Sequence, residues 1–458
     1  MKKIVLFLVS FCCLFLSFIF VGCADNRPID CYFIEIEYGN DTLTGSLTYD
    51  FLLKDKNKEV WFNLYPNVYV EEGQGMKIKS VLFEGVACKW QTQGDKNEFL
   101  KVQLSNGCKT NKNYTLQIEF ETAVPKSLSR HGKTEKCVNL AYFYPIACAY
   151  ENGYIINEFA LCGDPFTSDL ANYLVKITLP STMSVACGGE SKGIQIMGEK
   201  SAYLYSLNNV KTFACSLSEN YSVVKRKVGE VDVAYYYYDE QTPENTLDLI
   251  ISALDYLQNI GKYFYKNLTV AKTPYFAGGM EYPAFCVVGE NANEKNYQTA
   301  ILHEIFHQIA PIVLFTNETQ SAYLDEGLAE FLTYSFLQNQ DKNSLYSRAL
   351  YCESYLTAYK NNCQKQGITY NGALNRGLTS YATKEEYAVN SYNKGFLFFY
   401  YINEKHEEVL PLIKKLYRKK AFKKIDEEDI IKVMKNKKRA KEIFYKFVFN
   451  GEDIILEK

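Results

Sequence analysis

The chain has 458 residues, a length that favours two domains over a single ordinary core. Its residues are 47% hydrophobic and 23% charged, which is typical of a globular protein. The formal net charge is -2, with acidic and basic residues mixed along the chain and no long basic block, so the composition argues against a nucleic-acid-binding protein.

The first 23 residues have the pattern of an export signal. Two lysines precede an apolar run over residues 4–21, which is followed by Gly22 and Cys23. The ending FVGC resembles the bacterial lipobox, in which the cysteine is lipidated and becomes the mature N-terminus, although leucine is usual where Phe20 stands. A membrane anchor helix is the alternative, for which 18 apolar residues are barely enough. We predict a lipoprotein signal over residues 1–23, lipidation at Cys23, and a membrane-anchored protein on the extracytoplasmic side.

The spacing of the cysteines matches no recognisable disulfide framework. Of the 14 cysteines, three fall within the first 23 residues, which leaves 11, an odd number without a CxxC pair. An extracytoplasmic setting permits disulfides, but the sequence does not determine their pairing. Burial as small hydrophobic side chains is the alternative for most of them. No cysteine spacing supports a zinc site.

Residues 24–226 are predicted to form a β-sheet domain. In YTLQIEFET, Leu116, Ile118 and Phe120 alternate with polar residues, which is the period of a half-buried strand. YLVKITLP, residues 173–180, repeats this pattern. Clusters such as SNGCKTNKN break the strands apart. A β-sandwich or a curved sheet fits this region.

From about residue 240 the period changes to that of helices. A long amphipathic helix is expected after Pro243, and residues 268–291 return to a strand-and-turn pattern. We therefore expect an α+β protein whose second domain spans residues 227–458. Helices are predicted over 296–310, 321–338, 342–362, 384–404, 406–419, 426–435 and 437–449.

The stretch ILHEIFHQIAP, residues 301–311, carries two of the four histidines, and Pro311 is expected to end its helix. His303 and His307 lie one helical turn apart on one face, so both imidazoles can point at one ion. Glu304, next to the first ligand, is placed to act as the base for a water molecule at the metal. Three polar residues that merely share a helix are the alternative.

A zinc site needs a third protein ligand and an open fourth position. Within SAYLDEGLAEFLTY, Glu326 follows His307 after 18 intervening residues, and Glu330 lies one turn further on. We predict that Glu326 is the third ligand and that Glu330 accepts a hydrogen bond from a ligand histidine. Two histidines and a carboxylate are a hydrolytic zinc arrangement, although other metals could use the same ligands. We expect one zinc ion per chain.

These motifs resemble those of the gluzincin aminopeptidases of the aminopeptidase N type, which carry HExxH followed after 18 residues by glutamate. GGMEYP, residues 278–283, is similar to the family's G-x-M-E-N strand beside the zinc. SYNKGF, residues 391–396, is similar to its Tyr-x-Lys-Gly segment. GDPFTSDLANYLVKITLP, residues 163–180, is similar to the stretch that closes its N-terminal β-domain. The resemblance covers about residues 30–450.

The resemblance implies a saddle-like, antiparallel β-domain followed by a thermolysin-like, mostly helical catalytic domain. It implies that Gly278, Gly279 and Met280 offer backbone groups to an extended peptide and that Glu281 receives the α-amine of the substrate. It also implies that Tyr392 is the catalytic tyrosine, which would stabilise the oxyanion opposite zinc. A packing residue and a solvated loop charge are the alternatives for Tyr392 and Glu281.

Two departures from the family pattern bear on activity. Tyr282 replaces the family's asparagine, which weakens the case for strict exopeptidase action. The large helical C-terminal domain of many members has no counterpart here, which suggests a more open cleft. We predict a zinc-dependent peptidase that removes N-terminal residues from peptides. The alternatives are an endopeptidase on longer chains and a surface binding protein without turnover. Side-chain preference, peptide length and oligomeric state are not determined.

Overall fold

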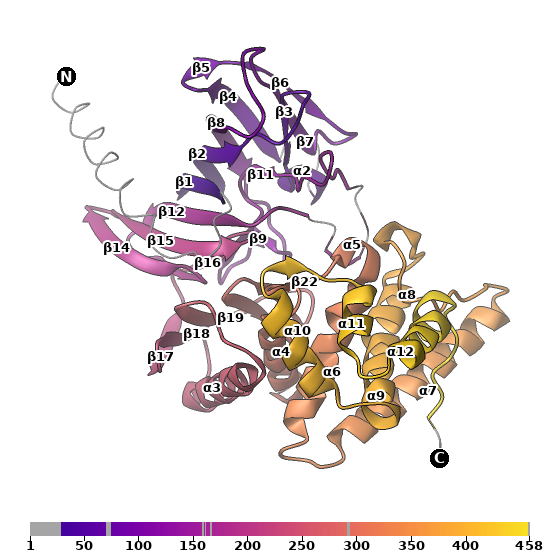
Figure 1. The fold of residues 1–458 in the computed structure, drawn as a ribbon. Coiled ribbons are helices and arrows are strands. Elements are labelled where there is room, and N and C mark those ends of the chain that lie inside the picture. Colours follow the sequence, from indigo (N-terminus) through magenta and orange to yellow (C-terminus); the bar gives the residue numbers. More distant parts are fainter. Residues whose placement is uncertain are drawn as a thin grey trace, which may run out of the picture.

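The computed structural model describes residues 29–69, 75–157, 160, 162–164, 167–290 and 294–456 (Figure 1). The predicted signal peptide and the lipidation site Cys23 lie outside the described residues. In the part of the chain that is described, no helix combines the length and the apolar character needed to cross a membrane. The 11 cysteines of the described residues are free thiols.

An eight-stranded sheet forms the frame of the N-terminal domain (Figure 1). Its neighbouring strands are antiparallel except β1 and β12, which run parallel. The predicted core face of residues 114–122 is confirmed, because Leu116, Ile118 and Phe120 are all buried. In sheet order the strands are β14 (Glu190–Met197), β15 (Lys200–Val210), β12 (Ala171–Pro180), β1 (Asp30–Gly39), β2 (Thr42–Leu52), β8 (Asn113–Ala123), β4 (Met76–Phe83) and β5 (Val86–Ala87).

Two four-stranded sheets complete this domain, and aromatic side chains fill the space between strands. The rings of Tyr32 and Tyr173 stack with their centroids 4.6 Å apart. One sheet has the order β13 (Ser184–Cys187), β16 (Ala214–Ser218), β10 (Val138–Ala141) and β9 (His131–Lys133). The other has the order β11 (Ile146–Ala147), β3 (Glu59–Asn63), β7 (Phe99–Gln103) and β6 (Lys89–Gln93), and the short helix α2 spans Pro66–Tyr69.

A five-stranded sheet begins the second domain. Its order is β17 (Ser222–Val228), β18 (Val231–Tyr237), β19 (Asn267–Thr273), β21 (Phe285–Gly289) and β20 (Gly279–Tyr282). Strands β18, β19 and β21 are parallel, whereas the terminal strand β20 is antiparallel to β21. Helix α3 (Pro243–Ile260) connects β18 to β19. The domain division after residue 226 stays a prediction, and it falls within β17.

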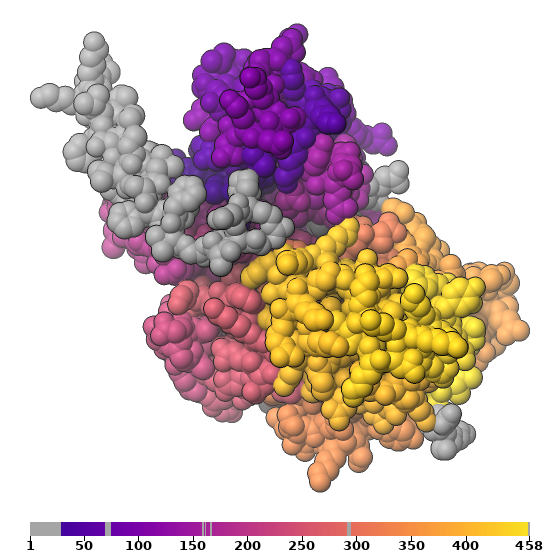
Figure 2. Space-filling model, in the orientation of Figure 1, coloured from indigo at the N-terminus to yellow at the C-terminus, as the bar shows by residue number. Residues whose placement is uncertain are grey.

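The rest of the chain is mostly helical, which confirms the predicted α+β class. The helices are α4 (Glu294–Phe306), α5 (Glu318–Ser321), η1 (Ala322–Leu324), α6 (Glu326–Leu337), α7 (Ser344–Lys365), η2 (Leu378–Ser380), α8 (Lys384–Ala388), η3 (Val389–Lys394), α9 (Gly395–Lys405), α10 (Val409–Lys420), α11 (Glu427–Val433), α12 (Lys437–Ile443) and η4 (Phe444–Phe449). Two short strands in this region, β22 (Leu314–Phe315) and β23 (Lys423–Lys424), pair with each other in parallel. Figure 2 shows the yellow C-terminal residues packed beside the salmon and orange parts of the chain.

The structure differs from the predicted helices at three places near the motifs, one of which is the helix predicted over 321–338, since it is divided into η1 and α6. Helix α4 ends at Phe306, before Pro311, because the amides of Gln308 and Ile309 bond to carbonyls three residues back and form turns. The side chain of Gln308 holds this turn against β20 and β21, since it donates to the Tyr282 carbonyl at 2.9 Å and accepts from the Ala284 amide at 2.8 Å. The helix predicted over 384–404 contains a π-helical segment, η3, which carries Tyr392.

Candidate metal centre and active site

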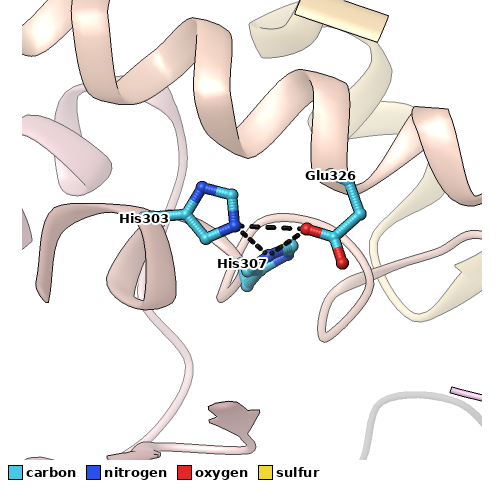
Figure 3. A group of neighbouring side chains, drawn as sticks. All are labelled: His303, His307 and Glu326. Carbon is cyan, nitrogen blue, oxygen red and sulfur yellow. Dashed lines mark hydrogen bonds and ion pairs between the residues drawn. The ribbon is translucent and has the colours of Figure 1, made fainter. Parts of the chain in front are cut away.

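The two predicted histidine ligands and Glu326 come together although they lie on different helices. His303 is in the last turn of α4, His307 follows it in the adjoining turn, and Glu326 is the first residue of α6. The two Nε2 atoms are 3.0 Å apart, and Oε2 of Glu326 lies 3.2 Å from each of them. Figure 3 shows the three side chains pointing at one common position.

This donor set fits a zinc ion. In a tetrahedral site with zinc–ligand distances of 2.0–2.1 Å, neighbouring ligand atoms are about 3.3 Å apart. The observed separations of 3.0 and 3.2 Å are close to that edge length. Imidazole nitrogen and carboxylate oxygen are also donors that zinc accepts. The residues that the sequence motif selects are therefore arranged as three of four tetrahedral ligands.

The electrostatics of the three side chains show a buried carboxylate that needs positive charge. Burial opposes ionisation of Glu326, but contacts with both histidines lower the pKa of that carboxyl well below its usual range. Burial likewise opposes charge on His303, yet Glu326 and Glu330 raise the pKa of His303 to about 10. A dication would supply the positive charge that stabilises the buried Glu326 carboxylate, and it would displace the protons from both imidazoles.

Each imidazole is supported on the side that faces away from the ligand cluster. Nδ1 of His307 lies 2.9 Å from the Ala310 carbonyl oxygen, to which it donates, so Nε2 is left to bind a metal. Nδ1 of His303 lies 3.1 Å from Oε1 of Glu330, which is within the distance of an ion pair. Glu330 therefore lies where the sequence predicts a supporting carboxylate.

Glu304 faces the same cluster with a free carboxylate oxygen. Its side chain is buried, and Oε2 has no hydrogen-bond partner among the described residues. Burial raises the pKa of Glu304 to about 8, and a dication beside it would lower that pKa and favour the carboxylate. A Cβ atom at Gly279 would lie 2.5 Å from Oε1 of Glu304, so only glycine lets β20 approach this side chain. Oxygen atoms of Glu281 and Glu304 and a nitrogen of His307 all lie within 4.8 Å of one another.

The strand β20 places Gly279, Met280 and Glu281 beside α4, as the resemblance implies. Gly278 precedes the strand, and a Cβ atom there would lie 4.0 Å from Cβ of Ala300 on α4. As the terminal strand of its sheet, β20 has one edge that no other described strand covers. Backbone groups at such an edge can pair with an extended peptide.

Glu281 lines a cavity of about 40 Å³ between the two domains. Glu318 from α5 lines it from the catalytic side, while Asp164 and Lys211 approach from the β-domain. Nζ of Lys211 lies 3.6 Å from Oε1 of Glu318, and burial raises the pKa of Glu318 to about 8 against the effect of that lysine. The sequence analysis missed these three residues. Glu318 and Lys211 belong to no motif, and Asp164 lies in the 163–180 stretch without a role assigned to it; only the packing of the domains brings the three to Glu281.

Tyr392 lies directly at the metal ligands. Its hydroxyl donates to Oε1 of Glu326 at 2.6 Å, and its ring stacks on His303 with the centroids 5.7 Å apart. Tyr387 is the other candidate tyrosine, and its hydroxyl is 3.4 Å from the same carboxylate oxygen. The π-helical turn of η3 between the two tyrosines changes the direction in which Tyr392 points relative to a regular α-helix.

Comparisons with known proteins agree with this geometry. Residues 246–447 match the family model described as "Peptidase family M1 domain". A mutant M1 zinc metallopeptidase from Deinococcus radiodurans has a similar fold, with a TM-score of 0.70, 14% identity, and coverage of 94% of this chain and 95% of that chain. The same mutant bound to a Tyr-Ser-Ala substrate gives a TM-score of 0.68, 13% identity, and coverage of 94% and 95%.

A two-domain M1 zinc metallopeptidase mutant bound to L-arginine is also similar, with a TM-score of 0.66, 14% identity, and coverage of 94% of this chain and 95% of that chain. At these identities the likeness concerns the fold, and it extends over both the β-domain and the helical domain. None of the curated protein sequences is significantly similar to the chain.

Proposed function

Because residues 246–447 match the family model of the M1 peptidases and the whole fold is similar to that of an M1 zinc metallopeptidase, we propose that the chain is an aminopeptidase that holds one zinc ion and removes N-terminal residues from peptides. The substrate is a peptide with a free α-amine, whose first residue lies between Glu281 and the metal ligands. The described geometry supports this assignment at three points: the amine end of the site, the reacting centre and the strand beside it.

The cavity at Glu281 is the observation that carries the proposal. It measures about 40 Å³ and is lined by residues of both domains. One water molecule needs roughly 10–15 Å³ of such space, so the cavity has room for an ammonium group and not for a further peptide residue. A peptide with its scissile bond at Glu304 would bring a free α-amine close to the Glu281 carboxylate. This argument favours an exopeptidase over an endopeptidase.

The chain's own residues account for the proton transfers. Bound zinc would supply Lewis acidity toward a water molecule and the scissile carbonyl. Glu304 takes the proton of the attacking water through its free Oε2 and passes it to the leaving amine. The Tyr392 hydroxyl, which donates to Glu326 at 2.6 Å, turns to the developing oxyanion. The terminal strand β20 orients the peptide through the backbone of Gly278, Gly279 and Met280.

The protein acts outside the membrane and is held there by a lipid on Cys23. The support for this part is the signal pattern of residues 1–23, which ends in FVGC. A single acyl chain binds membranes only marginally, so a lipoprotein needs the several chains that bacterial lipidation attaches.

Turnover of matched peptides tests the proposed specificity. The purified full chain is given one peptide with a free N-terminus and the same peptide with an acetylated N-terminus. We expect release of the first residue from the free peptide alone, loss of activity with a chelator, and recovery with zinc. The Glu304→Gln variant, which keeps the side-chain shape and lacks the base, serves as the inactive control. Internal cleavage of the acetylated peptide at a comparable rate would identify an endopeptidase.

A further inference from the structure

Arg348 lies behind the metal ligand His303 and belongs to none of the sequence motifs. It is on α7, and 17% of its side chain is exposed. Its Nη2 atom lies 2.8 Å from Oε2 of Glu330, whose other oxygen lies 3.1 Å from Nδ1 of His303. One carboxylate therefore stands between the guanidinium and the imidazole, in a site from which most water is excluded.

The same guanidinium reaches the segment that carries Tyr392. Nη2 of Arg348 donates to Oδ1 of Asn393 at 3.5 Å, and Sγ of Cys352 donates to that oxygen at 3.6 Å. Asn393 directly follows Tyr392 within η3. A π-helical turn has weaker intrinsic stability than an α-helical one, so side-chain contacts such as this one help to hold it.

Two aromatic rings keep the guanidinium in place. Its Cζ atom lies 5.1 Å from the ring centroid of Tyr334 and 4.9 Å from that of Tyr351. A planar, delocalised cation stacks on such rings and presents several N–H groups in fixed directions. A lysine at this position would keep the charge, but it could not stack on both rings and hold both polar partners at once.

We propose that Arg348 is a positioning residue that couples zinc binding through His303 to the placement of Tyr392. Arg348 fixes the carboxylate of Glu330, which orients the His303 ring so that Nε2 faces the metal. Through Asn393 the same side chain fixes the turn from which Tyr392 reaches Glu326. This inference rests on the zinc peptidase part of the proposed function and not on the preference for a free N-terminus.

Zinc affinity, measured without substrate by competition with a chelator, is the first test. We expect Arg348→Met to bind zinc about 10-fold more weakly, because it releases Glu330, the partner of a ligand histidine, and disturbing such a partner typically costs about 10–100-fold in affinity. Arg348→Lys should recover part of the affinity, because its ammonium can still reach Glu330. The Co²⁺-substituted protein should show an altered visible absorption spectrum in Arg348→Met, since the His303 ring is less firmly oriented.

Arg376 provides a matched control. Its guanidinium pairs with Glu386 at 2.7 Å and lies 4.2 Å from the ring centroid of Tyr381, but it contacts neither the zinc ligands nor Asn393 in the described residues. Arg376→Met should lower the melting temperature and leave zinc affinity unchanged. An equal loss of zinc affinity in both variants would show a general effect of removing a buried arginine and would overturn the proposal.

The turnover number at saturating zinc tests whether the contact with Asn393 holds Tyr392 in place. Asn393→Ala should keep the zinc affinity of the wild type and lower kcat by about 10-fold, because only the placement of Tyr392 changes. A folded Arg348→Met protein with unchanged zinc affinity would overturn the inference, as would an Asn393→Ala protein with unchanged kcat. If Arg348→Met does not fold, the same two measurements are made on Arg348→Lys. Wild-type zinc affinity together with wild-type kcat in Arg348→Lys would contradict the coupling.

These readouts are separate from the test of specificity. Zinc affinity does not depend on which peptides are cleaved, so the coupling can hold even if acetylated peptides are cleaved internally. Conversely, a strict requirement for a free amine would stand if Arg348 proved irrelevant to zinc.

Discussion

The hydroxyl of Tyr392 donates a hydrogen bond of 2.6 Å to Oε1 of Glu326, the residue whose Oε2 faces both histidines. One carboxylate thus joins the proposed oxyanion donor to the metal ligands. The tyrosine is held within reach of the reacting centre before substrate arrives, and its ring is stacked on His303.

Removing only this hydroxyl should impair catalysis without removing the metal. Tyr392→Phe keeps the ring stacked on His303, and loss of one oxyanion donor typically costs on the order of 10²–10³ in kcat. KM should change little, because the bond is used mainly in the transition state. The measurement is steady-state kinetics together with zinc content. Tyr387→Phe is the control, since its hydroxyl is further from Glu326, at 3.4 Å. The reverse pattern would make Tyr387 the donor.

Glu281 should matter most for substrates with a free amine. A carboxylate pairs with an ammonium through a charge-assisted hydrogen bond, which is stronger than one between neutral groups. Glu281→Gln should therefore lower kcat/KM for free peptides by on the order of 10²-fold. Glu290→Gln, which alters a carboxylate paired with Lys136 outside the site, is the control. Equal losses on free and N-acetylated peptides would point to a structural role for Glu281.

The number of zinc ions per chain follows from the three-ligand site. The purified wild-type protein should contain about one zinc per chain, by metal analysis of the protein after dialysis. His307→Ala removes a ligand whose Nε2 lies 3.0 Å from that of His303, and it should lose the metal. His131→Ala is a control, because His131 is buried in the β-domain and bonds to the Ala123 carbonyl. Full zinc occupancy in His307→Ala would refute the assignment.

Lys394 should make stability rise with pH above 8. It is buried and donates to the carbonyls of Gly372 and Gly451, and burial lowers its pKa from 10.5 to about 8. Between these two values the unfolded chain binds more protons than the folded one, so the free energy of unfolding increases with pH. The free energy of unfolding should increase by on the order of 1 kcal/mol through this group between pH 8 and about 9.5.

Urea unfolding of the wild type and of Lys394→Met across that interval isolates the contribution of Lys394. Buried tyrosines with raised pKa values act in the opposite direction nearer pH 10, and they are common to both proteins. The difference between the two proteins should therefore show the slope of Lys394 alone. Parallel pH profiles would mean that Lys394 does not titrate in this range.

The anchoring prediction concerns residues outside the described part of the chain. Cys23→Ser should abolish labelling with a radioactive fatty acid and leave an unprocessed precursor, because the lipidated sulfur is missing. Cys31→Ser, which alters a cysteine at the start of the β-domain, is the control and should be labelled like the wild type. Normal labelling and processing of Cys23→Ser would disprove the lipobox interpretation.

That His303 and His307 lie close together could be predicted from the sequence, because their spacing is set by helix geometry. A turn of helix places His303 and His307 on one face, and the amide of His307 still bonds to the His303 carbonyl at 3.2 Å although α4 has ended. The strand pattern around Leu116 likewise follows from the period of two. Each of these inferences needs only residues that are close together in the chain.

By itself, the sequence predicted the candidate zinc ligands, the candidate base and the order of a β-domain before a helical domain, since local periodicity and one tight motif encode them. Only the tertiary structure decided what surrounds them. Lys211 and Asp164 meet Glu281 because the β-domain packs on β20, and Arg348 meets Glu330 because α7 packs on α6. Such contacts join residues that are distant in the chain. Their energy depends on burial and charge in the folded protein, and the spacing of residues in the sequence does not predict it.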